Sequence, residues 1–120
     1  MDTRVIRIDA EAEFLTLERC NILESWNDPS DPGVSIARAR VKPGGTTQLH
    51  CLDVDERYLI LQGEGVAKID ELAPTAVGPG DVVTIPASTQ QQITNTGESD
   101  LLFYCICSPR FEQRHYHELE

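Results

Sequence analysis

The chain has 120 residues, of which 40% are hydrophobic and 25% are charged. A chain of this length can bury one independent hydrophobic core, so we predict a single domain over residues 1–120. Its 20 acidic residues against 10 basic ones give a net charge of −10. Such a surface repels nucleic-acid phosphates and anionic lipid head groups, so we expect neither nucleic acid nor membrane as a partner. We interpret the charge as a means of solubility.

The cysteines and the first residues bear on location. No apolar run approaches the roughly 20 residues that a membrane helix needs, and residues 1–5 precede no apolar segment of the secretory type. Cys20 and Cys51 are isolated, and Cys105 and Cys107 lie two apart rather than in a redox C-x-x-C pair. We therefore expect reduced thiols and a cytoplasmic location.

Short runs of β-branched and aromatic residues alternate along the chain with Gly, Pro, Asn and Asp, which is typical of an all-β sandwich or barrel. In chain order we predict strands over residues 20–24, 34–41, 58–61, 66–69, 75–77, 82–86, 91–95 and 101–107. Glycines at 63 and 65 indicate a tight turn before a hairpin. Ser108 can cap a helix that has Pro109 in its first turn, so the sequence predicts a short C-terminal helix or tail.

Two gapped patterns lie between residues 44 and 95. The first, over 44–65, has Gly44, five residues, His50, Cys51, Leu52, three residues, Glu56, six residues and Gly63. The second, over 80–95, has Gly80, five residues, Pro86, Ala87, Ser88, two residues, Gln91, three residues and Asn95. These spacings resemble the cupin family motifs G-x5-H-x-H-x3-4-E-x6-G and G-x5-P-x-G-x2-H-x3-N. The resemblance implies an all-β double-stranded β-helix, which is a jelly-roll barrel of two sheets.

The resemblance also implies a metal site with altered ligands. In metal-binding cupins, two His and the Glu of the first motif hold the ion together with the His of the second motif. This chain keeps His50 and Glu56, whereas Leu52 and Gln91 stand at the two other ligand positions. Leu52 shares the strand face of His50 but cannot ligate a metal. We therefore predict His50, Glu56 and Gln91 as weak ligands of a divalent ion such as Mn, Fe, Ni or Zn.

A metal-free interpretation of the same side chains stays open. His50, Glu56 and Gln91 could bond to one another as a satisfied buried polar cluster. A purely structural cluster is a costly use of three polar groups in a core, which favours a functional role over a structural one.

Other side chains are expected around this site. Leu52, Phe103 and Cys105 are predicted to line the pocket, with Cys105 acting as a small apolar residue rather than a ligand. Glu56 is predicted to be catalytic, as a general base or a ligand, and Tyr58 on the same strand face is expected to donate a hydrogen bond to the substrate.

Four basic or ionisable side chains are expected outside the site. Arg38 and Arg40 share one strand face, which we interpret as a solvated outer face rather than an anion site. His115 and His117 are two apart near the C-terminus, and this spacing does not place them on one face of a helix. We interpret both histidines as surface residues.

Two classes of function follow. The first is a metal-assisted isomerase, lyase or dioxygenase acting on a small polar metabolite. The second is a metal-free barrel that binds a small sugar-like ligand without catalysis, which the apolar Leu52 favours. Small cupins often pair their N-terminal strands across a two-fold axis, so the resemblance also implies a homodimer.

Overall fold

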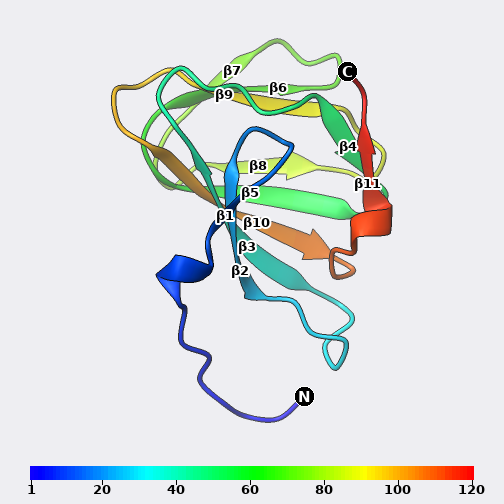
Figure 1. Cartoon of the computed structure of the whole chain (residues 1–120). Coiled ribbons are helices and arrows are strands. Elements are labelled where there is room, and N and C mark those ends of the chain that lie inside the picture. Colours follow the sequence, from blue (N-terminus) through cyan, green and yellow to red (C-terminus); the bar gives the residue numbers. More distant parts are fainter.

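The computed structural model describes residues 1–120, and its strands form two antiparallel sheets that face each other (Figure 1). The six-stranded sheet has the order β1 (Phe14–Leu15), β2 (Asn21–Trp26), β3 (Ser35–Val41), β10 (Leu101–Ser108), β5 (Asp55–Gln62) and β8 (Val82–Ile85). The five-stranded sheet has the order β11 (Tyr116–Glu118), β4 (His50–Leu52), β9 (Gln91–Asn95), β6 (Gly65–Ile69) and β7 (Thr75–Val77). Two 3₁₀ turns complete the chain, η1 (Ala10–Ala12) and η2 (Gln113–His115). The predicted jelly roll is confirmed.

The core lies between the two sheets because one face of each strand is apolar. Burial alternates along β5, where Glu56, Tyr58 and Ile60 are buried and their neighbours are not. This is the period-2 pattern of a strand with one face toward the core. Strands of both sheets contribute to one cluster of 11 buried residues, which are Cys20, Ala39, Val41, Tyr58, Ile60, Ala67, Ile69, Ile85, Ile93, Leu101 and Phe103. The inward face of β5 therefore carries both core residues and the candidate catalytic residues.

The final residue of each motif secures a turn. Gly63 has φ +87°, and a Cβ atom there would come within 2.7 Å of the carbonyl oxygen of Asp100, so any side chain would collide with the backbone. Asn95 is fully buried, and its Nδ2 donates to the carbonyls of Val41 and Ser99 at 2.8 Å each. Its Oδ1 accepts from the Gly97 amide at 2.9 Å. These contacts fix the connection between β9 and β10.

The C-terminal segment differs from the predicted helix. Ser108 is the last residue of β10, and the chain continues through the turn η2 into the strand β11. Strand β11 pairs antiparallel with β4, placing Tyr116 opposite Leu52 and Glu118 opposite His50. Pairing with the open edge of β4 satisfies backbone groups that a helix would satisfy internally, so the long-range partner overrides the local capping signal.

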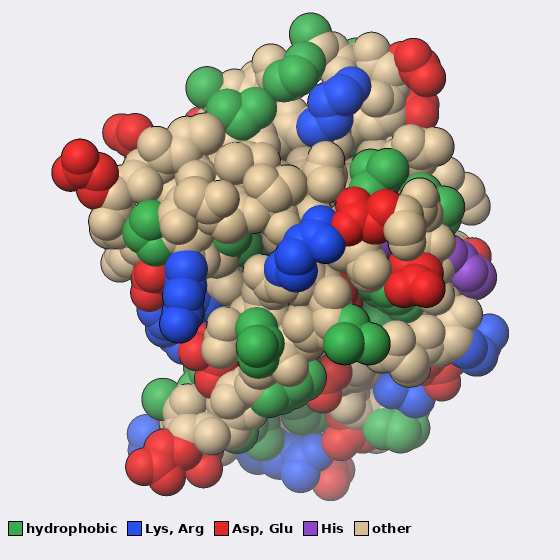
Figure 2. Space-filling view, turned by 45° about the horizontal axis from the view of Figure 1, so that its top comes forward, with side chains coloured by type: hydrophobic (Ala, Val, Ile, Leu, Met, Phe, Trp, Pro, Cys, Tyr) green, Lys and Arg blue, Asp and Glu red, His purple; other side chains and the backbone are tan.

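The N-terminal arm, residues 1–13, lies outside the barrel (Figure 1) and is anchored near both of its ends. Near the start, the Arg4 guanidinium lies 3.5 Å from Asp28 and 5.5 Å from the centre of the Trp26 ring. Glu13 forms ion pairs with Arg38 at 3.3 Å and with Arg40 at 3.2 Å. On the face shown in Figure 2, basic and acidic side chains lie close to one another, with hydrophobic side chains between them. No helix in the structure has both the length and the apolar character needed to cross a membrane.

Candidate functional site

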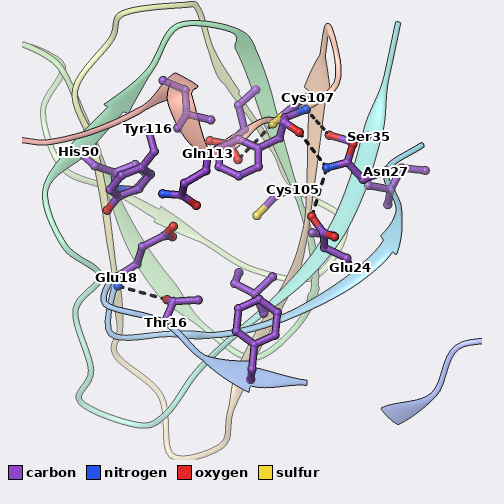
Figure 3. A pocket seen from close by; sticks show the side chains of 17 residues that line it. Thr16, Glu18, Glu24, Asn27, Ser35, His50, Cys105, Cys107, Gln113 and Tyr116 are labelled. Carbon is purple, nitrogen blue, oxygen red and sulfur yellow. Dashed lines mark hydrogen bonds between the residues drawn. The ribbon is translucent and has the colours of Figure 1, made fainter. Parts of the chain in front are cut away.

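A cavity of about 160 Å³ opens between the two sheets, beside the C-terminal strand β11. Figure 3 shows side chains from both sheets, from the turn that precedes β2 and from η2 around it. The lining residues are Phe14, Thr16, Glu18, Ile22, Glu24, Asn27, Ser35, Ile36, Ala37, His50, Leu52, Glu56, Cys105, Cys107, Phe111, Gln113 and Tyr116. Apolar walls with a few polar groups between them are typical of small-molecule sites.

His50 is held in one orientation at the wall of this cavity. Its Nδ1 lies 2.6 Å from the carbonyl oxygen of Gln48, and its ring stacks on Tyr116 with centroids 4.9 Å apart. Because a carbonyl can only accept, Nδ1 carries the proton and donates, which leaves the Nε2 lone pair free. Burial lowers the pKa of His50, so the imidazole is neutral near pH 7.

Glu56 is a carboxyl group without a cationic partner. Its residue is 6% exposed, and burial raises its pKa to about 7, with the charge of Glu18 adding to the rise. The Cys107 thiol lies 3.7 Å from Oε2, while Oε1 is buried and has no hydrogen-bond partner. Glu56 therefore exists in both protonation states near neutral pH and has an oxygen free for a ligand.

Tyr58 and Gln91 form a buried pair behind the cavity wall. The Tyr58 hydroxyl donates to Gln91 Oε1, and Gln91 Nε2 is buried without a hydrogen-bond partner. The Gln91 amide lies close enough to Glu56 to lower the pKa of its carboxyl group and so offset part of the rise from burial. Gln91 Nε2 and Glu56 Oε1 nevertheless do not form a hydrogen bond. The Gln91 side chain therefore points its oxygen toward Tyr58. Its NH₂ group faces the Glu56 carboxyl group without a hydrogen-bond partner.

The residues present do not offer a full set of metal ligands. No group of three or more His, Cys, Asp or Glu side chains is arranged to hold an ion. His50 Nε2 and Glu56 Oε1 are free, but the Gln91 oxygen is engaged by Tyr58, and the free amide nitrogen is a donor that cannot ligate a metal. Leu52, which lines the cavity, supplies no ligand.

The other predicted pocket residues divide between the cavity and the core. Leu52 and Cys105 line the cavity, whereas Phe103 does not. Phe103 is 2% exposed and packs against Tyr58 with ring centroids 4.5 Å apart. Strand alternation predicted correctly that Phe103 faces inward. It could not predict whether an inward side chain packs in the core, as Phe103 does, or lines the cavity. The expected role of Phe103 in the lining is therefore replaced by a role in the core.

Sequence reasoning missed Gln48, which connects several parts of the site. The Gln48 amide donates to the carbonyl of Glu18 at 2.9 Å, its own carbonyl accepts from His50, and its side-chain oxygen accepts from the Tyr116 hydroxyl. Glu18 and Tyr116 line the cavity but lie outside both motifs, where no pattern could indicate them. Gln48 lies two residues before β4, outside any strand, and no pattern indicated its role.

The remaining candidate residues lie outside the cavity. Arg38 and Arg40 share the carboxylate of Glu13, and Arg38 Nε is buried without a hydrogen-bond partner. His117 is exposed and lies 2.8 Å from Asp53. His115, which we expected at the surface, is instead buried at 6% exposure, because η2 folds it inward and its Nδ1 accepts from the Glu112 amide at 3.1 Å.

Residues 37–107 match the model of the cupin domain. The chain belongs to the cupin family. No curated protein matches the chain. Among solved structures, Pac13, a nucleoside dehydratase, is 16% identical with a TM-score of 0.78, covering 98% of this chain and 92% of its own. A Streptomyces PAC13 variant has been solved with uridine.

Two further cupin neighbours cover most of this chain. KdgF from Halomonas sp. is 18% identical with a TM-score of 0.77, over 93% of this chain and 99% of its own. A predicted oxalate decarboxylase from Thermotoga maritima is 26% identical with a TM-score of 0.68, over 75% of this chain and 80% of its own. These likenesses show a shared fold on which different reactions occur.

Proposed function

We propose that this cupin is an enzyme that moves a proton on a small metabolite, as an isomerase or a lyase, and that Glu56 is its general acid and base. The observation that carries the proposal is the Glu56 carboxyl group, which is buried beside the cavity with a pKa of about 7 and one unpartnered oxygen. General acid–base catalysis is most efficient when the pKa lies near the operating pH.

The chemistry balances without an oxidant. The Glu56 carboxylate takes a proton from a carbon atom next to a carbonyl group of the substrate, and the electron pair of the broken C–H bond moves toward that carbonyl. In an α-hydroxy carbonyl substrate, the carboxylic acid then returns the proton to the former carbonyl carbon while the proton of the α-hydroxyl group moves to the former carbonyl oxygen, which gives an isomer. In a β-hydroxy carbonyl substrate, the acid instead gives the proton to the departing hydroxyl group, which leaves as water as the new C=C bond forms. The free His50 Nε2 orients the substrate by accepting a hydrogen bond. Gln91, which Tyr58 holds behind the cavity wall, is a positioning residue for the Glu56 carboxyl group.

The metal-assisted reaction that the family pattern implies fits these residues less well. His50 and Glu56 would supply two ligands, and a third requires Gln91 to release Tyr58 and turn its oxygen into the site. A dioxygenase would depend on such an ion. We therefore propose that the reaction proceeds without a resident metal, and the metal content of the untagged protein tests this part directly.

Solvent deuterium exchange tests the proposal without a known substrate. Simple aldoses and small uncharged hydroxyketones, each with a C–H bond next to a carbonyl group, are incubated with the protein in D₂O, and exchange of carbon-bound hydrogen is followed by NMR. We expect exchange with at least one compound and a loss of 10²–10⁴-fold in Glu56→Gln. Exchange that persists in this variant contradicts the role of Glu56. Exchange that depends on near-stoichiometric Mn, Fe, Ni or Zn contradicts the metal-free route, and binding without exchange would indicate the alternative, a ligand-binding barrel.

We also propose that the protein is a homodimer. Strand β1 is the edge of the six-stranded sheet, and its outer side pairs with no strand. Seven of the eleven exposed large hydrophobic side chains lie in the first 17 residues. An open edge next to exposed apolar side chains favours pairing with a second copy across a two-fold axis.

A further inference from the structure

The ionisable groups around the cavity are all acidic or neutral. Three carboxyl groups line it, those of Glu18, Glu24 and Glu56, and no lysine or arginine does. The one imidazole is that of His50, which burial keeps neutral. The thiols of Cys105 and Cys107 and the phenol of Tyr116 stay protonated, because burial raises the pKa of each. The cavity therefore contains no group that would compensate the charge of an anion.

The guanidinium groups of Arg110 and Arg40 already form ion pairs. Arg110 contacts the lining residue Asn27 at 3.0 Å, but it also forms an ion pair with Glu112 at 3.2 Å. Arg40 is paired with Glu13 and with Asp100, the latter at 2.7 Å. Binding an anion at either arginine would require one of these pairs to break, which removes much of the gain.

Glu18 is placed so that its charge acts on a ligand. It lies in the turn between β1 and β2, and its carboxyl group points into the cavity near His50 and Tyr116 (Figure 3). Its backbone carbonyl is fixed by the Gln48 amide at 2.9 Å, and its Oε2 lies 3.8 Å from the Cys20 thiol. No basic side chain pairs with it. Burial raises the pKa of Glu18, so its carboxyl group carries its full charge at mildly alkaline pH, where no cation within the site neutralises it.

We propose that the cavity takes small polar molecules that are uncharged or carry an amine, and that Glu18 is the specificity-determining residue that rejects anions. The selectivity follows from Coulomb repulsion inside a partly desolvated cavity, where a carboxylate is felt several-fold more strongly than in water. The apolar wall of Ile22, Ile36, Leu52 and Phe111 suits the flat or aliphatic side of a ring compound. The charge selectivity concerns binding alone, and only its relevance to catalysis rests on the proposed function.

The charge selectivity is tested with three molecules that share one ring and differ in charge, namely benzyl alcohol, benzylamine and benzoate. Saturation-transfer NMR at millimolar ligand and mildly alkaline pH measures their relative affinities. We expect benzyl alcohol and benzylamine to bind and benzoate to bind at least about tenfold more weakly. Benzoate binding as tightly as benzyl alcohol, or no binding by any of the three, would overturn the proposal.

Variants at Glu18 separate its charge from its shape. Glu18→Gln should strengthen benzoate binding by about tenfold, whereas Glu18→Asp should keep the rejection. Glu71→Gln removes an exposed carboxyl group outside the cavity and should leave the order of affinities unchanged. An unchanged affinity ratio in Glu18→Gln, with unaltered thermal unfolding, would overturn the assignment of Glu18.

Glu56→Gln should lose deuterium exchange yet still bind benzoate most weakly of the three molecules. Failure of the catalytic proposal is therefore distinguishable from failure of the binding proposal.

Discussion

At the scale of single residues, Glu56 determines how the protein responds to pH. Burial raises the pKa of this carboxyl group from an ordinary value of 4.5 to about 7 in the folded state. Between these two values the unfolded chain releases a proton that the folded protein keeps. The contribution of Glu56 to stability is therefore most favourable below pH 4.5, and it becomes less favourable as the pH rises toward 7.

We predict that Glu56→Gln removes this dependence. A pKa difference of this size corresponds to about 3 kcal/mol of unfolding free energy. Urea unfolding at about pH 5 and about pH 8 should show the wild type losing stability relative to Glu56→Gln by that order of magnitude. Glu71→Gln, which changes an exposed carboxyl group, should follow the wild type. Parallel pH profiles for wild type and Glu56→Gln would show that the carboxyl group is not perturbed.

The motif spacing predicted where His50, Glu56 and Gln91 lie, because strand alternation fixes which side chains face inward. It could not predict the direction of the Gln91 amide, since that depends on Tyr58, a partner 33 residues away in the chain. It also could not indicate Glu18, which reaches the cavity only because the turn before β2 lies against Gln48. The family pattern gives the positions of a site, and the neighbouring side chains decide its chemistry.

At the scale of elements, most strands were predictable, including the three-residue β7 at Thr75–Val77, which the hairpin turn before it indicated. Strand β10 has eight residues and is almost wholly apolar, and β9 lies within the second motif, which indicated its position. Strands β1, β4 and β11 have two or three residues each, which is too short for a periodic signal. Their pairing partners define them, and the predicted terminal helix failed for the same reason.

Asn95 should be the residue on which the connection from β9 to β10 most depends. Asn95→Ala removes two donated bonds and one accepted bond from a fully buried side chain, so we expect a loss of about 2–4 kcal/mol of unfolding free energy. Asn21→Ala on the partly exposed strand β2 is the matched control and should cost less than about 1 kcal/mol. Equal losses from chemical denaturation of the two variants would mean that this turn is not held by the Asn95 side chain.

At the scale of the whole molecule, the exposed N-terminal side chains predict self-association. Size-exclusion chromatography with light scattering should give twice the 13.4 kDa mass of one chain. Replacing Leu15 and Leu17 by Glu should shift the protein to the monomer, because these side chains are 72% and 90% exposed beside the open edge of β1. Leu72→Glu, at an equally exposed site in the turn after β6, should leave the mass unchanged. A monomeric wild type would refute the dimer.

The bond from the Gln48 backbone amide to the Glu18 carbonyl joins the turn between β1 and β2 to the segment that leads into β4, the strand that carries His50. Phe14 of β1 also belongs to the cavity wall, so a second copy paired with β1 would restrict the motion of one side of the cavity. Ligand binding and self-association would then be thermodynamically linked, and each would strengthen the other by the same factor. The ligand dissociation constant would consequently depend on protein concentration, falling as the chains associate.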